Sequence, residues 1–367
     1  NYCPTCIEGR DMKMTDELEI LFSRRGGVGH IKFNRPKALN ALNYDMVLEI
    51  QKKLDEWEKD PDVAAVIIQG EGDRAFCAGG DIRRLAETSK KEGLGYCREF
   101  FSSEFKLNRT VFRYSKPYIA ILDGITMGGG VGLSVHGHYR IATERTLFAM
   151  PETGIGYFPD VGGSYFLPRC PGSIGMYLGL SGARLKTGDS LKAGISTHYV
   201  ETRLVDSLIA GIEDLAPSRD VAAKLDILLS QYCSELEDET LTTNLDTINH
   251  CFSKNSVEET LNALDEIDEE WSKQTASSIR KKSPTSLKVT FRQLKEGKCL
   301  SFEDCMVMEL RLALRFMADH DFYEGVRAVI IEKDNQPRWM PDSVKGVSEE
   351  AVARYFLPLG KDDLNFV

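Results

Sequence analysis

The sequence of 367 residues lacks the long uninterrupted apolar run from which a membrane-spanning helix is built. Its most apolar long stretch, Tyr118–His138, contains Asp123 and six glycines, which a helix buried in lipid rarely tolerates. No secretory signal pattern opens the chain, which begins with Asn1, so an upstream targeting segment could have been removed. We therefore expect a protein that has no membrane partner.

Signals for disulfides, metals and common cofactors are also sparse. The nine cysteines are an odd number spread from Cys3 to Cys305, a pattern typical of reduced thiols in an intracellular protein. Cys3 and Cys6 form a C-x-x-C motif without a second pair, and His136 and His138 have no neighbouring ligand cluster. No G-x-G-x-x-G or G-x-x-x-x-G-K-[ST] fingerprint is complete. The sequence predicts no metal site and no bound cofactor.

The charge is acidic overall but unevenly distributed. The net charge of −10 argues against a nucleic-acid partner. Residues 211–270 contain sixteen Asp and Glu against three Lys and Arg, so the remainder of the chain is slightly positive. That remainder could therefore accept a phosphorylated ligand.

Short apolar segments that alternate with helical patterns predict an α/β protein. Two strand-like segments, 18–22 and 28–33, flank the turn residues Arg24-Arg25-Gly26-Gly27. Strand–strand–helix units then recur, which indicates stacked ββα modules and not the βαβ alternation of a dinucleotide-binding domain. Further strands are predicted over 63–69, 118–123, 139–143 and 147–150, and helical segments over 44–59, 92–113 and 128–136.

The pattern changes near residue 215, after which the chain is helical and, at first, acidic. We predict an N-terminal extension (1–17), a core (18–215) and a helical remainder with an acidic insertion (216–367). Ser256 and Ser301 each precede an acidic residue by three positions, as helix-capping boxes do. The second box opens an apolar helix, 302–317, that could pack internally or join copies in a homo-oligomer.

Three glycine-rich loops, each directly after a predicted strand, are the main candidates for chemistry. They cover residues 75–81, 123–132 and 150–163. Glycine allows a backbone to approach a ligand closely, and a glycine run at a helix start leaves several N–H groups free to donate. Any one of these loops could instead be a tight turn or a close helix–strand contact.

Together the three loops resemble the crotonase (enoyl-CoA hydratase/isomerase) superfamily. The resemblance covers residues 18–215, includes an opening loop at 35–42, and resumes in the tail from Glu324-Gly325 through Lys333 and Pro337 to Trp339. It implies a spiral of stacked ββα units with a helical C-terminal region. It also implies that the partner is an acyl-CoA thioester, whose coenzyme A is part of the substrate.

The resemblance assigns roles to individual residues. Gly80 and Gly129 match the two backbone donors of the superfamily's oxyanion hole, which stabilise charge on the thioester oxygen. Glu152 matches a catalytic glutamate. The positions that match the coenzyme A contacts are Lys37, Ala38, Ala78 and Asp81.

The acidic residues distinguish between reactions. Hydratases of the superfamily carry a second glutamate where this chain has Gly132, and adding water to a double bond needs a paired acid and base. Glu152 with Asp160, and Glu104 as a substrate contact, resemble instead the family of 3-hydroxyisobutyryl-CoA hydrolases. That resemblance implies thioester hydrolysis in valine breakdown in the mitochondrial matrix. Two alternatives stay open: another crotonase reaction, such as hydration or isomerisation, and a non-catalytic acyl-CoA binding protein.

Overall fold

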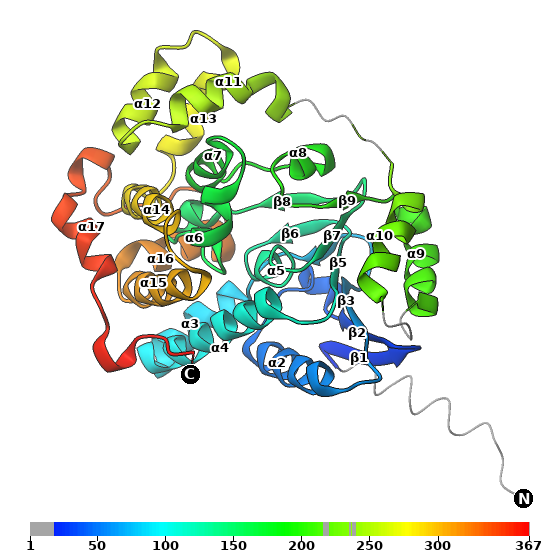
Figure 1. Cartoon of the computed structure of the whole chain (residues 1–367). Coiled ribbons are helices and arrows are strands. Elements are labelled where there is room, and N and C mark those ends of the chain that lie inside the picture. The colour runs from blue at the N-terminus through cyan, green and yellow to red at the C-terminus, as the bar shows by residue number, and fades with distance from the viewer. Residues whose placement is uncertain (1–17, 216–219, 235, 237–239, 367) are drawn as a thin grey trace, which may run out of the picture.

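The computed structural model describes residues 18–215, 220–234, 236 and 240–366. The predicted extension 1–17, with Cys3 and Cys6, lies outside the described residues. The strands form a six-stranded sheet in the order β1-β2-β3-β5-β7-β9 and a three-stranded sheet in the order β4-β6-β8 (Figure 1). Their bounds are β1 Ile20–Arg25, β2 Val28–Phe33, β3 Ala65–Gly70, β4 Ala75–Cys77, β5 Tyr118–Leu122, β6 Ile125–Met127, β7 Tyr139–Ala142, β8 Leu147–Ala149 and β9 His198–Tyr199.

A tight hairpin begins the fold. β1 and β2 pair antiparallel with Arg25 opposite Val28, so Gly26 and Gly27 alone form the turn. Gly26 has φ +55°, a left-handed conformation that glycine adopts without strain. The first strand therefore lies a few residues later than the predicted 18–22, because the two arginines continue it instead of entering the turn.

The remaining strands build a spiral. All later neighbours in both sheets are parallel, and β3, β5 and β7 of the large sheet are followed in the chain by β4, β6 and β8 of the small one. Each turn of the spiral thus contributes one strand to each sheet before the chain continues into helix or loop. The predicted α/β fold of stacked ββα units, with a helical C-terminal region, is confirmed.

Both faces of the large sheet are buried, as in most parallel sheets. In β3, Val66 and Ile68 face a cluster that includes α2 (Tyr44–Lys59) and the end of α4 (Leu94–Arg113), while Ala65 and Ile67 face the opposite side. That opposite side is covered by α9 (Thr202–Leu215) and α10 (Val221–Tyr232). The bounds of α2 agree with the prediction, since Val47, Ile50, Leu54 and Trp57 form its buried face.

Two predicted helices differ from the structure. The segment predicted over 92–113 begins at Leu94, and a further helix, α3 (Ile82–Glu92), precedes it. Asp81 caps α3 by accepting a hydrogen bond from the Arg84 amide, and Gly93, with φ +79°, separates the two helices. The segment predicted over 128–136 is helical only in α5 (Gly129–Gly132), because its glycines favour close packing over a regular helix.

The C-terminal helices pack against the core instead of forming a separate cluster. One hydrophobic cluster runs from Leu85 in α3 to Leu364 near the C-terminus, and Figure 1 places α15 (Phe302–Phe316) and α16 (His320–Val326) beside α3 and α4. Ser256 and Ser301 cap their helices as predicted. Most of the apolar side chains of α15 (Phe302–Phe316) are buried inside the chain. The helices here are α11 Thr240–Phe252, α12 Val257–Asp265, α13 Glu270–Arg280, α14 Pro284–Gly297, α16 His320–Val326 and α17 Glu349–Phe356.

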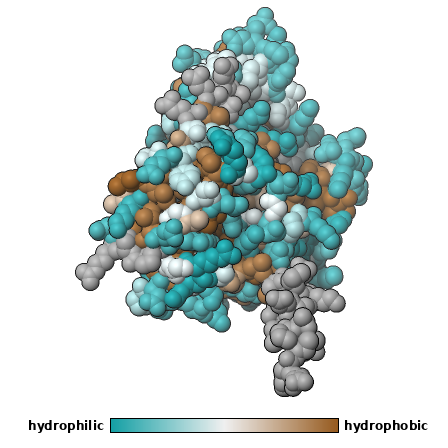
Figure 2. Space-filling view, turned by 90° about the vertical axis from the view of Figure 1, so that its right-hand side faces the viewer, coloured by the Kyte–Doolittle hydropathy of each residue, from teal (hydrophilic) through white to brown (hydrophobic). Residues whose placement is uncertain are grey.

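No helix within the described residues combines the length and the apolar character needed to cross a bilayer. On the face turned toward the viewer in Figure 2, hydrophobic residues are interspersed with hydrophilic ones.

One buried amide organises the loop that leaves β2. Asn40 is fully buried with φ +56°, and its side-chain oxygen accepts a hydrogen bond from the Arg35 amide. Its Nδ2 donates to the carbonyls of Glu71 and Ala75. Asn40 therefore ties the loop after β2 to both ends of the β3–β4 connection.

Replacing Asn40 with alanine should lower the free energy of unfolding by about 2–4 kcal/mol, because one buried and two partly buried hydrogen bonds are lost while their backbone partners remain shielded from water. Urea denaturation measures the change. The matched control is Gln274→Ala, which removes an exposed amide on α13. Equal stability of the Asn40 and Gln274 variants would contradict the role given to Asn40.

Candidate active site

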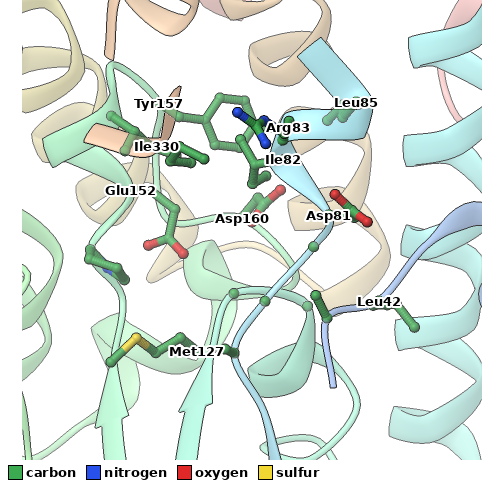
Figure 3. Close-up of a pocket in the computed structure, with 18 of the residues that line it drawn as sticks. Leu42, Asp81, Ile82, Arg83, Leu85, Met127, Glu152, Tyr157, Asp160 and Ile330 are labelled. Atoms are coloured by element: carbon green, nitrogen blue, oxygen red, sulfur yellow. The ribbon is translucent and has the colours of Figure 1, made fainter. Parts of the chain in front are cut away.

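A cavity of about 710 Å³ opens where the three glycine-rich loops meet. These loops follow β4, β6 and β8, which are parallel neighbours in one sheet, so all three leave the same sheet edge. Glu152 and Asp160 point into the cavity together with Met127 and Tyr157 (Figure 3). The walls also include α3, α4, the α13–α14 connection and residues after α16.

The amides of Gly80 and Gly129 lie side by side at the base of this cavity. A Cβ placed on Gly129 would lie 3.6 Å from the Gly80 nitrogen. Since a Cβ lies about 2.5 Å from the nitrogen of its own residue, the two amide nitrogens are within about 6 Å of each other. Among the hydrogen bonds of the described residues, neither amide donates to a protein acceptor. Both N–H groups are therefore free to donate to one ligand oxygen.

The donors do not depend on a long helix. α5 contains only four residues, so its dipole adds little to the field at Gly129. Any stabilisation of negative charge in this part of the site therefore comes from hydrogen bonds donated by the two free N–H groups.

Glu152 is a buried carboxyl group without a hydrogen-bond partner on Oε2. It is the first residue of the 3₁₀ helix η3 (Glu152–Ile155), and its Oε1 lies 3.6 Å from where a Cβ on Gly128 would be. Burial raises the pKa of Glu152 well above its usual range, and the nearby charge of Asp160 raises it further. Such a group can accept or hold a proton near neutral pH.

Asp160 lies in the same cavity, also buried. Burial raises its pKa to about 7. The Tyr157 hydroxyl faces Asp160 and opposes this rise, although no hydrogen bond of standard geometry joins the two side chains. Asp160 can therefore change protonation state in the range where a general base works.

Glu104 completes a group of three acids. It lies on α4, is only 3% exposed, and its Oε1 is 3.0 Å from where a Cβ on Gly129 would be. Burial raises the pKa of Glu104 well above its usual range, and the charge of Asp160 adds to the effect. Glu104 is therefore not a solvated residue on the surface of α4, because its side chain is buried and faces the cavity.

Gly132 leaves no room for a fourth acid. A Cβ on Gly132 would lie 2.6 Å from Nδ2 of Asn108 and 2.7 Å from Cβ of Val161. Any larger side chain requires these neighbours to move. The position at which hydratases of the superfamily carry a glutamate is thus closed by packing in this chain.

The residues predicted to bind coenzyme A divide into two groups. Ala38, Ala78 and Asp81 line the cavity, whereas Lys37 is exposed beside it in the short 3₁₀ helix η2 (Pro36–Ala38). The Asp81 carboxylate is already engaged, since it caps α3 and pairs with Arg35 at 3.1 Å. The coenzyme A contacts of these four residues stay predictions.

A model of the enoyl-CoA hydratase/isomerase family matches residues 28–356. The chain belongs to this family. It is 48% identical over 358 residues to "3-hydroxyisobutyryl-CoA hydrolase, mitochondrial" of Gallus gallus, covering 96% of this chain and 92% of that protein. The human protein of the same name is 46% identical over 364 residues, with coverage of 97% and 93%.

Solved structures of the family agree with the fold. A structure described as a carnitinyl-CoA dehydratase from Mycobacterium thermoresistibile has a TM-score of 0.88 at 36% identity and covers 95% of this chain and 98% of its own. A structure described as an enoyl-CoA hydratase from Rhodobacter sphaeroides 2.4.1 also has a TM-score of 0.88, at 34% identity, with coverage of 95% and 100%. Hence the shared fold extends across the C-terminal helices.

Basic residues around the cavity are the part of this family site that sequence reasoning missed. They come from α3, the loop after α7 (Ile174–Ser181) and the α13–α14 connection, so no local motif joins them. Lys282 is half-buried, and among the described residues no acidic side chain forms an ion pair with its ammonium group. The set consists of Arg83, Arg84, Arg184, Lys281 and Lys282.

The two histidines for which no metal site was predicted, His136 and His138, form hydrogen bonds with backbone groups. His136 contacts the Val161 carbonyl oxygen at 2.8 Å, and His138 Nδ1 accepts a hydrogen bond from the Tyr118 amide. Within the described ranges no three His, Cys, Asp or Glu side chains are grouped to hold a metal ion.

The raised pKa of Asp160 predicts a pH dependence of stability. A carboxyl group with a folded pKa of about 7 and an ordinary unfolded pKa near 4 binds more protons in the folded state between these values. Stability is therefore lost as pH rises from about 4 to 7. Asp160→Asn stays neutral, so at pH 8 it should exceed wild type by roughly 1–3 kcal/mol in free energy of unfolding, and the gain should vanish near pH 4.

Chemical denaturation at pH 4.5 and pH 8 measures this difference. Asp342→Asn, which neutralises an exposed aspartate, is the control and should behave as wild type at both pH values. An Asp160 variant whose stability relative to wild type is the same at both pH values would rule out a buried, ionisable Asp160.

Proposed function

We propose that this enzyme hydrolyses the thioester of 3-hydroxyisobutyryl-CoA to 3-hydroxyisobutyrate and free coenzyme A. Oxygen from water becomes bonded to the carbonyl carbon and the carbon–sulfur bond breaks. The thiolate sulfur leaves and takes up a proton. The reaction consumes one water and needs no oxidant, reductant or further reactant.

One observation carries the choice of hydrolysis over hydration. Hydration adds a proton and a hydroxide across a double bond and needs two placed acid–base groups. Gly132 occupies the position of one of them and has no space for a side chain. Glu152 and Asp160, two of the three acids in the cavity, share it with the free amides of Gly80 and Gly129, an arrangement suited to attack at a carbonyl.

The choice of acyl group rests on the relatives. Proteins 44–48% identical over nearly the whole chain are named 3-hydroxyisobutyryl-CoA hydrolase, mitochondrial. The proposal therefore includes the mitochondrial matrix as the compartment and valine breakdown as the process. Buried Glu104, near the oxyanion donors, is suited to accept a hydrogen bond from the 3-hydroxyl group.

The proposed roles follow from the position of each group. The amides of Gly80 and Gly129 donate to the thioester oxygen as it gains negative charge. Glu152 either attacks the carbonyl carbon, which gives an anhydride, or removes a proton from the attacking water. Asp160 orients that water or tunes Glu152 through its charge.

The basic residues of the cavity fit the phosphates of coenzyme A. Arg184, Lys281 and Lys282 lie on two separate connections, which would let them contact well-separated phosphate groups. Ala38 and Ala78 leave space for the adenine and the pantetheine arm. The proposal extends to a homo-oligomer, which light scattering of the purified protein measures.

A non-catalytic binding protein is the less favoured alternative. Three carboxyl groups are buried around the place where a thioester carbonyl would lie, and burying carboxylates costs free energy. A protein that only bound acyl-CoA would gain nothing from burying these carboxyl groups. A hydrolase gains from it, because burial raises their pKa values toward the pH at which they act as bases.

Replacing Glu152 with glutamine should lower kcat for coenzyme A release by about 10²–10⁴-fold, because the side chain keeps its shape but loses its basicity. KM should change less than about threefold, since the basic residues lie elsewhere. Release of free thiol from 3-hydroxyisobutyryl-CoA measures the rate. Glu266→Gln, at an exposed position, is the control.

Equal rates in wild type and Glu152→Gln would contradict the mechanism. Efficient hydration of crotonyl-CoA by wild type, without thiol release from 3-hydroxyisobutyryl-CoA, would contradict the function itself.

A pair of substitutions at Gly80 isolates its amide. A Cβ at Gly80 would meet only Ile82 Cδ1 within 4 Å, at 3.6 Å, so alanine fits and retains the N–H group. Proline removes that N–H group. We expect Gly80→Pro to lower kcat by about 10²–10³-fold and Gly80→Ala to retain at least about a tenth of the wild-type rate. A proline variant as active as the alanine variant would show that this amide is not used.

A further inference from the structure

The loop that carries Asp160 has a strained backbone. Val161, directly after Asp160, has φ +50°, a left-handed conformation that β-branched residues rarely adopt. Such a conformation costs about 1–3 kcal/mol and persists only where surrounding contacts impose it. The contacts that impose it here come from three distant segments.

Glu309 makes two of these contacts from α15. Its Oε2 accepts a hydrogen bond from the Gly162 amide and its Oε1 from the Ser164 amide, both at 2.9 Å. Two N–H donors on two oxygens suit an ionised carboxylate. Glu309 thus fixes the backbone on the C-terminal side of Val161.

Two more buried side chains hold the same loop. Gln293 of α14 donates from Nε2 to the Pro159 carbonyl at 2.6 Å and to Ser164 Oγ at 2.8 Å. His136 donates from Nε2 to the Val161 carbonyl at 2.8 Å. Burial lowers the pKa of His136 to about 4, which keeps the ring neutral. Residues 159–164 are therefore held at both ends and at the strained residue itself.

Placing Glu309 at this position costs folding free energy, because its carboxyl group is removed from water. It is fully buried, and no Lys or Arg in the described part of the chain forms an ion pair with it. Burial raises its pKa to about 8, although the two amide hydrogen bonds favour the ionised form. A buried carboxyl group without a cationic partner is a poor means of stabilising a fold in either protonation state, because apolar packing would serve better.

We infer that Glu309, assisted by Gln293, is a positioning residue that imposes the conformation of residues 159–164 and so directs the Asp160 carboxyl group toward the thioester. The inference rests on the proposed function for the role of Asp160. It assigns to the C-terminal helices an indirect part in catalysis, through Asp160, because neither side chain is among the residues that line the cavity.

The test compares two glutamate-to-glutamine substitutions on one helix. Glu309→Gln leaves a single acceptor oxygen for two amides. Glu303→Gln changes the first turn of α15, where Glu303 pairs with Arg109 and Arg113 away from the loop. We expect Glu309→Gln to lower kcat for 3-hydroxyisobutyryl-CoA by about ten- to a hundredfold with KM within about threefold, as for a misplaced catalytic group. Glu303→Gln should stay within about twofold of wild type.

Hydrogen–deuterium exchange supplies a readout that does not depend on turnover. The amides of Gly162 and Ser164 should exchange at least about tenfold faster in Glu309→Gln than in wild type, while β3 and β5 remain protected. Gln293→Met, which keeps the length of the side chain but removes its donor, tests the same loop if Glu309→Gln does not fold. It should lower kcat by roughly five- to twentyfold.

The outcomes are separable. A folded Glu309→Gln enzyme with kcat within twofold of wild type, or with unchanged exchange at Gly162 and Ser164, overturns the inference. Wild type that releases no thiol from 3-hydroxyisobutyryl-CoA overturns the proposed function instead, and the exchange data still decide whether Glu309 holds the loop. The inference about Glu309 would also be overturned if Glu309→Gln and Glu303→Gln lowered kcat equally, because both substitutions would then act only through a general effect on α15.

Discussion

Two backbone segments meet so closely that their side chains have to be absent. A Cβ on Gly130 would lie 2.3 Å from the Cys77 carbonyl oxygen, and one on Gly128 would lie 3.2 Å from Cα of Gly79. This contact between the loops after β4 and β6 places the Gly80 and Gly129 amides beside each other. The cavity, the carboxyl groups that surround it and the basic residues at its sides are all arranged about that pair of donors. Any side chain introduced at Gly128 or Gly130 would push the two loops apart and so separate the two amide donors, even if every catalytic side chain stayed in place.

The parts predicted from the sequence are those encoded by contiguous residues. The helix Tyr44–Lys59 and the three glycine loops have local patterns, and resemblance to a family gave their roles. Helix α3 was missed because its start depends on a single cap at Asp81, whose flanking residues resemble a loop. Lys282, Gln293 and Glu309 could not be found, since each lies more than a hundred residues from the loops it faces and only tertiary packing joins them.

The site also shows why a stable fold and a reactive site place opposite demands on one group of atoms. Glu104, Glu152 and Asp160 are removed from water, which raises their pKa values and makes them useful as proton acceptors. The same burial weakens the folded state whenever they ionise. The large sheet, buried on both faces, and the cluster that joins α3 to the C-terminal helices supply the stability that offsets this cost.

The distance in sequence between Gly162 and Glu309, 147 residues, bears on the order of events during synthesis. A ribosome needs on the order of ten seconds to add that many residues. The spiral core and all three glycine loops emerge first, and the strained loop then awaits the helix that fixes it. The nascent chain is thus expected to be able to bury its sheet before it can turn over substrate. A chain that ends before α15 would contain the three glycine loops, but it would lack the cavity wall after α16 and the contact that fixes the loop of Asp160.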